Sequence, residues 1–164
     1  MKKLQFIFAA LICLAIVQSI YYFPRVPEVM ASHFDGLGDP NGWSSKTVFF
    51  GIYAGVLVLT IIIFAVIPNK FLHRSKMWLN LPNKEYWLAP ERKDQTIGFI
   101  RSHLMYFGIV NVLLAIYVVQ LVILANFNAQ PRLSNTIVWA LMIYFAYVAI
   151  WLIRFFIRFR HESA

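Results

Sequence analysis

The stretch TVFFGIYAGVLVLTIIIFAVIP, residues 47–68, contains no charged residue and decides the class of fold. A helix of about 20 apolar residues is long enough to cross the hydrocarbon core of a bilayer. The same character recurs at residues 4–22 (LQFIFAALICLAIVQSIYY), 104–125 (LMYFGIVNVLLAIYVVQLVILA) and 136–153 (TIVWALMIYFAYVAIWLI). The whole chain agrees, since 60% of its 164 residues are hydrophobic and 13% are charged, against about a quarter charged in soluble domains. The sequence predicts an all-α membrane protein, a single domain with four transmembrane helices.

The first apolar stretch follows Lys2 and Lys3 and therefore also resembles a secretion signal. Its apolar part is longer than the central region of a typical signal, and no A-x-A-like cleavage site follows it. We expect an uncleaved first span.

Basic residues set the expected orientation. Twelve of the 15 lysines and arginines fall on the side that holds both termini and residues 69–103. Because basic loops stay in the cytoplasm, we expect a multi-pass membrane protein with both termini inside. The net charge of +8 then faces anionic lipids, so the lipid bilayer is the expected partner and nucleic acid is not needed to explain the charge.

The cytoplasmic loop, residues 69–103, is basic and aromatic. Pro90 fits the first turn of a helix, and Glu91 follows where the helix dipole favours an acid. We expect this helix to continue into the third span, and Trp78 and Trp87 to anchor the loop at the membrane surface. Docking of a cytoplasmic protein on this loop is the alternative.

The external loop, residues 23–46, is 24 residues long, and loops of that length are usually functional or have a structure of their own. We expect a tight turn at residues 39–42, a cap on the second span from Ser44 or Ser45, and Trp43 and Lys46 at the headgroups. As a structured loop it is the best candidate for a recognition element, formed by His33, Phe34, Asp35, Gly38, Asp39, Pro40, Trp43 and Lys46.

The sharper alternative for this loop is metal binding by His33, Asp35, Asp39 and Asn41. A calcium loop needs oxygen ligands at alternating positions and a closing Glu. Asp35 and Asp39 are four residues apart and no acidic residue follows them in the loop. We therefore predict no metal ligand.

The spans contain few polar residues, and no Asp, Glu, Lys or Arg lies in their central parts. Asn111 and Gln120 are expected to form hydrogen bonds between helices. Gly51 and Gly55 form a GxxxG motif, which we interpret as a packing face inside the bundle, with a dimer contact as the second choice. A proton-coupled carrier normally needs an ionisable relay at mid-depth, so a carrier is the weaker hypothesis.

No catalytic constellation is visible. The four histidines are scattered, and neither an HExxH pair, a G-x-S-x-G elbow nor a phosphate loop occurs. We expect no enzyme, no catalytic residue and no cofactor.

Two segments carry a resemblance. The first is the pattern P-x-V-P…H-F-x-x-x-G-x-P-x-x-W-x-S-K, matched by Pro24, Val26, Pro27, His33, Phe34, Gly38, Pro40, Trp43, Ser45 and Lys46. The second is NLPNKEYWLAPER, residues 80–92. The chain resembles the uncharacterised membrane domain of SdpI-like bacterial proteins. The resemblance implies the bacterial cytoplasmic (inner) membrane as the location. It also implies immunity against a secreted toxic peptide, or a receptor that holds a repressor at the membrane.

The sequence thus leads to one hypothesis and one alternative. The hypothesis is a non-enzymatic integral membrane protein of receptor, immunity or accessory-subunit type. Its partner would be a larger membrane complex, an extracellular peptide or a cytoplasmic protein. The alternative is a small carrier or lipid-handling membrane protein.

Overall fold

The computed structural model describes residues 1–71 and 81–160 of the chain. Within these ranges four helices are long and apolar enough to cross a membrane, which confirms the predicted class of fold. They are α1 (Lys2–Tyr22), the consecutive helices α2 (Lys46–Ile61), η1 (Ile62–Val66) and α3 (Ile67–Phe71), then α5 (Pro90–Ala125) and α6 (Thr136–Arg160). A short helix, α4 (Lys84–Trp87), precedes α5. Trp78, an expected surface anchor, lies outside the described residues.

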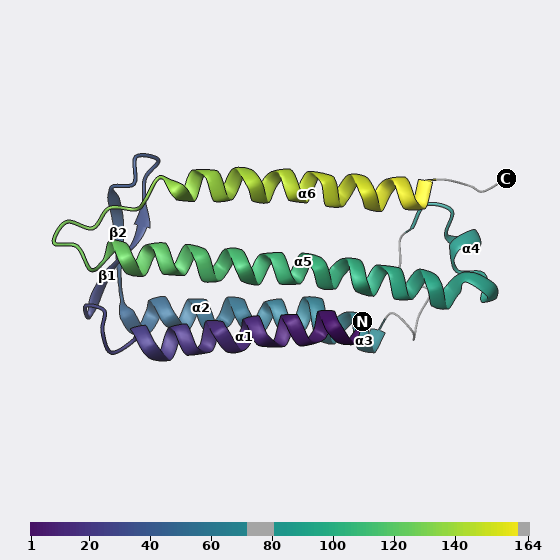
Figure 1. Cartoon of the computed structure of the whole chain (residues 1–164), viewed down its shortest axis with the longest axis horizontal. Coiled ribbons are helices and arrows are strands. Elements are labelled where there is room, and N and C mark those ends of the chain that lie inside the picture. The colour runs from purple at the N-terminus through teal and green to yellow at the C-terminus, as the bar shows by residue number, and fades with distance from the viewer. Residues whose placement is uncertain (72–80, 161–164) are drawn as a thin grey trace.

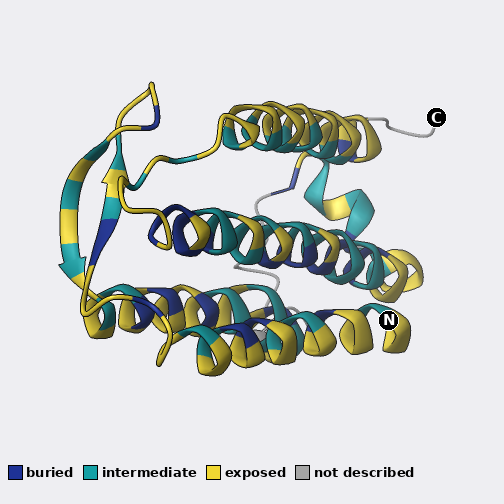
Figure 2. Ribbon diagram, turned by 60° about the vertical axis from the view of Figure 1, so that its left-hand side comes forward, coloured by how far each residue is buried: buried dark blue, intermediate teal, exposed yellow. Residues whose placement is uncertain are grey.

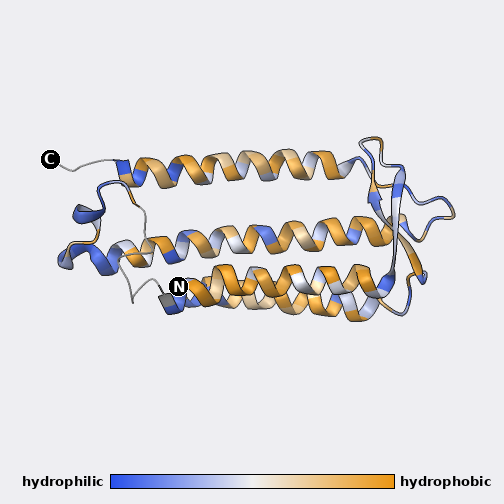
Figure 3. Cartoon of the chain, turned by 180° about the vertical axis from the view of Figure 1, so that it is seen from behind, coloured by the Kyte–Doolittle hydropathy of each residue, from blue (hydrophilic) through white to orange (hydrophobic). Residues whose placement is uncertain are grey.

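The four long helices run side by side, with two strands at one end of the bundle (Figure 1). Apolar residues dominate the middle of each helix and polar residues gather at both ends (Figure 3). We call the end with the strands and residues 126–135 the hairpin end. The opposite end, where α1 begins and α6 finishes, is called the basic end.

Helix α5 is the centre of the bundle. It contacts α1, α2 and α6 and lies between α6 and the α1–α2 pair (Figure 1). The main hydrophobic core joins α1, α2 and α5, with Ala15, Met105 and Ile123 almost fully enclosed. Helix α6 is different, because Phe159 is its one buried residue within the described part of the chain, and most of its surface is exposed or intermediate (Figure 2).

Helix α6 is joined to α5 mainly near the basic end, by stacked rings. The His103 ring lies 4.4 Å from that of Trp151, nearly parallel to it, and Phe107 lies 4.6 Å from Trp151 on the next turn. The Trp151 indole N–H donates to the His103 carbonyl at 3.0 Å, and His103 Nε2 lies 3.2 Å from the Trp151 carbonyl. Reciprocal bonds of this kind hold two helices together where the hydrophobic effect offers no driving force.

Helix α5 has 36 residues, so it is about 54 Å long and exceeds the roughly 30 Å hydrocarbon core. The expected continuous helix from Pro90 is therefore confirmed. At the basic end Leu81, Leu88, Ile100 and Phe159 form a second, smaller core. The Trp87 indole N–H donates to the Phe159 carbonyl at 3.2 Å, so the segment before α5 packs beneath α5 and α6.

The π-helical turn η1 precedes Pro68. Pro68 has no N–H to donate to the carbonyl of Phe64, and its ring crowds that carbonyl, so the regular ladder cannot continue there. The resulting turn places Phe64 against α5, where its ring lies 5.6 Å from that of Phe107.

The loop between the first two spans, residues 23–46, contains an unexpected β-hairpin. Strand β1 (Val29–Phe34) pairs antiparallel with β2 (Pro40–Ser45). The pairing is irregular on both sides of His33, which lies opposite Gly42. The hairpin crosses the end of the bundle beside α2 and α5 (Figure 1). The expected tight turn at residues 39–42 is wrong, because Pro40 already begins β2.

The expectation that Gly51 and Gly55 pack inside the bundle is also wrong. Both glycines are exposed on α2, and a Cβ added to either would meet nothing within 4 Å. The close helix contact is instead at Gly108 on α5, where an added Cβ would lie 2.7 Å from Phe64 Cβ. A residue without a side chain is needed there, because the neighbouring atom is fixed to the backbone.

We predict that Gly108→Ala lowers the thermal stability of the purified protein in detergent. The added methyl overlaps Phe64 Cβ, and such overpacking typically costs about 1–3 kcal/mol. Gly55→Ala is the matched control, since its methyl points into open space. The stability of both variants is measured as a melting temperature, obtained from the fraction of protein that stays monodisperse after heating. A loss of stability in Gly55→Ala equal to that in Gly108→Ala would contradict the assignment.

Candidate recognition site at the hairpin

The turn of the hairpin, residues 35–39, is built by Asp35. Its Oδ1 accepts hydrogen bonds from the backbone N–H groups of Leu37 and Asp39, both at 2.9 Å. The Asp35 N–H also donates to the Asp39 carbonyl at 2.9 Å. Gly38 has φ +86°, which glycine adopts without steric cost. Asp35 and Gly38, two of the predicted recognition residues, therefore shape the loop.

The tip of the hairpin rests on the connection between α5 and α6. The Leu133 N–H donates to the Gly38 carbonyl at 2.8 Å. A Cβ on Gly38 would lie 2.6 Å from the Leu133 carbonyl oxygen. Glycine is therefore required at this position both for its positive φ and for this close approach. Arg132 Nε lies 3.6 Å from Asp39 Oδ1 with both side chains more than half exposed, and such a pair adds little stability.

Asn126 fixes β1 to the end of α5. Its side-chain Oδ1 accepts from the Ala31 N–H at 2.8 Å, and its Nδ2 donates to the Ala31 carbonyl at 2.9 Å. The amide thus pairs with Ala31 as a neighbouring strand would. Nδ2 also donates to the Val122 carbonyl at 2.9 Å, which satisfies a carbonyl in the last turn of α5. Asn126 and Ala31 are both buried.

Three further predicted recognition residues, Phe34, Pro40 and Lys46, and the predicted cap Ser45 position the hairpin. Phe34 packs against the main core and pairs with Pro40 across the two strands. Lys46 Nζ lies 2.7 Å from a carboxylate oxygen of Glu28, so this lysine ties the start of β1 to the start of α2. Ser45 is the cap of α2, since its hydroxyl accepts from the Val48 N–H at 3.2 Å.

A cleft of about 400 Å³ lies between the hairpin, α2 and α5. Its roof is polar and comes from the strands: Ser32, His33, Trp43 and Ser44. Its walls are apolar and come from the two helices: Val48, Phe49, Ile52, Tyr53, Val56, Ala115, Val118 and Val119. A pocket of this size with a polar rim and apolar walls fits an amphipathic ligand.

His33 and Trp43 are the predicted recognition residues that line this cleft. The opposing Gly42 leaves room for the imidazole, because a Cβ there would lie 3.0 Å from His33 Cβ. His33 Nδ1 lies 3.1 Å from the hydroxyl of the neighbouring Ser32. The Ser44 hydroxyl is buried and has no hydrogen-bond partner among residues 1–71 and 81–160. A buried hydroxyl without a partner is costly, and because it is enclosed it is not a contact point for an occupant; His33 and Trp43 are the side chains that the roof presents.

Tyr53, in the wall of the cleft, belongs to a polar cluster that crosses three helices. The Tyr53 hydroxyl donates to Gln18 Oε1 at 3.1 Å, and Gln18 Nε2 donates to Gln120 Oε1 at 3.0 Å. Gln120 Nε2 in turn donates to the Tyr22 hydroxyl at 3.0 Å. Gln120 therefore makes interhelical hydrogen bonds. Asn111 does so too, because its Oδ1 accepts from the Tyr144 hydroxyl of α6 at 3.1 Å.

The geometry brings no metal set together in the described part of the chain, where no three His, Cys, Asp or Glu side chains gather. Asp35 is engaged by the turn and Asp39 by Arg132. Of the eight predicted recognition residues, two face the cleft and the others build or orient the hairpin. Ser32, Ser44, Tyr53 and Asn126 were not predicted as part of the site.

Comparison with known proteins gives one match. A family model described as a domain of unknown function, DUF1648, matches residues 10–57. This range holds most of α1, the whole hairpin and the first turns of α2, and is under a third of the chain. No curated protein and no solved structure matches. An uncharacterised domain is expected here; the match names no SdpI-like protein and carries no activity or ligand.

We predict that Asn126→Ala loosens the hairpin from the bundle. The substitution leaves the Ala31 N–H and carbonyl buried without partners, at about 1–3 kcal/mol for each group. Hydrogen exchange of the Ala31 amide and protease cleavage within residues 29–45 should both rise. The control is Asn128→Ala, since Asn128 is exposed and makes one long hydrogen bond to Leu124 at 3.4 Å. Unchanged protection of Ala31 in Asn126→Ala would show that the amide does not hold β1.

Proposed function

We propose that the chain is a non-enzymatic integral membrane protein of receptor, immunity or accessory-subunit type. The cleft under the hairpin would be its recognition site. The observation that carries this proposal is the combination of a polar roof, containing Ser32, His33 and Trp43, with apolar walls on α2 and α5. Such a cleft favours a ligand with an apolar body and a polar end, such as an extracellular peptide or the exposed segment of a larger membrane complex.

The surroundings of His33 support binding over catalysis. Its one hydrogen-bond partner within the described residues is the Ser32 hydroxyl, next to it in the chain. A nucleophile needs a base that is itself oriented by a third group. The roof of the cleft supplies no carboxylate for that third role.

We propose that the hairpin lies outside the bacterial cytoplasmic membrane and that the basic end lies inside. In the described residues, three basic side chains belong to the hairpin end: Arg25, Lys46 and Arg132. Those of the opposite end are Lys2, Lys3, Lys70, Lys84, Arg92, Lys93, Arg101, Arg154, Arg158 and Arg160. This asymmetry favours a cytoplasmic location for the basic end.

The second candidate function is lipid handling. It is favoured by the position of the cleft walls, which belong to the apolar spans: Val56 and Val119 lie well inside α2 and α5. A lipid chain would meet the same walls as an apolar peptide. The two functions differ in the class of molecule found in the cleft and in whether lipid moves across the membrane.

We predict that a photoreactive benzoylphenylalanine in place of Trp43 crosslinks a discrete polypeptide in intact cells. The same residue in place of Asn41 is the matched control, since Asn41 is exposed on β2 and does not line the cleft. The captured segment is then synthesised, and its affinity for the reconstituted protein is measured. His33→Ala should weaken binding about tenfold, the effect of one lost polar contact, whereas Asn41→Ala should not.

Two results would contradict the proposal that the cleft binds a polypeptide. Equal crosslinking from position 41 would remove the cleft as the site. Crosslinking to phospholipid, together with faster movement of a fluorescent lipid across proteoliposomes containing the protein, would select the lipid-handling alternative.

We predict that Leu37→Cys, in a Cys13→Ser background, reacts with a membrane-impermeant maleimide in intact cells. Leu37 is 70% exposed at the tip of the hairpin, so the thiol is accessible wherever the hairpin faces the reagent. Asp94→Cys, at an exposed position of α5 near the basic end, should react only after the cells are permeabilised. The reverse pattern would overturn the proposed orientation.

A further inference from the structure

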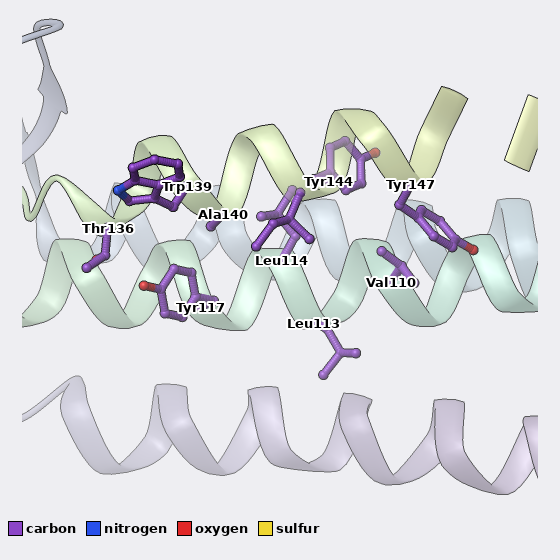
Figure 4. Close-up of a pocket in the computed structure, with 10 residues that line it drawn as sticks. Val110, Leu113, Leu114, Tyr117, Thr136, Trp139, Ala140, Tyr144 and Tyr147 are labelled. Carbon is purple, nitrogen blue, oxygen red and sulfur yellow. The ribbon is translucent and has the colours of Figure 1, made fainter. Parts of the chain in front are cut away.

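The seam between α5 and α6 is hollow along one side. At the hairpin end a hollow of about 570 Å³ lies between Tyr117 and Val110 of α5 and Thr136, Trp139 and Tyr147 of α6 (Figure 4). At the basic end a second hollow of about 680 Å³ continues between the same helices. Tyr147 lines both hollows. We call the two together the seam groove.

The α6 residues of the seam groove follow one helical face. Positions 136, 139, 143, 147, 150, 154 and 157 recur at spacings of three and four, which places their side chains in one stripe. The stripe is aromatic or aliphatic along most of its length, and it changes character only at the basic end. There the groove is lined by Arg154 and Arg158.

The two arginines differ in how they are held. Arg158 lies over the rings of Trp87 and Phe99, at 5.2 Å and 5.6 Å from their centroids. Arg154 is exposed, and the described residues give it no hydrogen bond or ring contact. In that part of the chain the ion pairs are Glu28–Lys46 and Asp39–Arg132, so no described carboxylate neutralises either guanidinium.

The depth of Arg154 in the helix is that of a headgroup. It lies 18 residues beyond Thr136, at the start of α6, which corresponds to about 27 Å along the axis. The hydrocarbon core is about 30 Å thick. A guanidinium at this position reaches the headgroup layer at the basic end, while the groove above it runs through the hydrocarbon layer.

We propose that the seam groove is a binding site for one anionic phospholipid. The phosphate would be held between Arg154 and Arg158, and an acyl chain would lie along the apolar stripe toward Tyr147. Guanidinium groups bind phosphate through paired, charge-assisted hydrogen bonds. Half of the hydrocarbon core, about 15 Å, spans roughly ten residues of helix, so the chain from a headgroup at Arg154 ends near Tyr144, in the neighbouring hollow.

The proposal is tested by adding single lipids to the full-length protein in mild detergent. Binding of phosphatidylglycerol and of phosphatidylcholine is measured by native mass spectrometry and by the shift in melting temperature. Phosphatidylglycerol should bind and stabilise, and phosphatidylcholine should do so much less. Arg154→Gln should reduce the preference for phosphatidylglycerol about tenfold or more, as expected for a lost hydrogen bond to a charged group.

The matched control is Arg160→Gln, which removes the same charge from the same helix end without touching the groove. Arg154→Lys keeps the charge and should recover only part of the preference. Arg154 is exposed and makes no hydrogen bond, ion pair or ring contact with the described residues, so loss of folding is not expected, and the melting temperature without lipid checks this.

Two outcomes would overturn the proposal. An equal loss in Arg160→Gln would mean general attraction of anionic lipid to a basic surface. Stabilisation by inorganic phosphate equal to that by phosphatidylglycerol would mean an anion site with no use for the groove. These results are independent of the hairpin cleft, since neither the lipids nor the variants involve it.

Discussion

The hairpin end of the molecule depends on one side-chain amide. Asn126 ends α5 and pairs with both backbone groups of Ala31, so the strand is held at the height where the central helix ends. With β1 fixed there, β2 follows by pairing, and Ser45 begins α2 directly from the end of β2. These contacts place the hairpin across the ends of α2 and α5. The space between the hairpin and the two helices is not filled, and this space is the cleft.

The four spans could be predicted from the sequence because their cause is local. An apolar stretch of sufficient length specifies a membrane helix whatever it contacts, and the same holds for Pro90 as the first residue of α5 and for Ser45 as a cap. The hairpin could not be predicted in this way. VMASHF has no alternation of apolar and polar residues, and the partners that stabilise it, Asn126 and Leu133, lie about a hundred residues further along the chain. The sequence drew attention to the residues of the recognition loop but not to their roles. Asp35 and Gly38 build the turn and Lys46 pairs with Glu28, which only their contacts reveal.

The glycines show the same division. Gly51 and Gly55 have the spacing of a packing motif, yet they face outward because the buried face of α2 is formed by Phe50, Tyr53 and Leu57. Gly108 belongs to no recognisable motif, and it is required because it faces Phe64, which lies in the π-helical turn before Pro68. The requirement for glycine at position 108 therefore depends on the local geometry of another helix. Such a dependence has no signature in either stretch of sequence.

Helix α6 contacts α5 closely at one end only, which leaves the seam between the two helices open to lipid. Helices in a membrane gain nothing from burying apolar surface against each other when lipid can cover it equally well. Helix α6 accordingly meets α5 firmly where stacked rings and the reciprocal bonds of His103 and Trp151 offer more than lipid does. Elsewhere the seam stays open, with one polar bond from Tyr144 to Asn111. The cleft and the seam groove thus share one arrangement, with their polar groups at opposite ends of the bundle. In each, the walls are apolar and can be covered by any acyl or apolar side chain. The polar group at the membrane surface then determines which molecule binds.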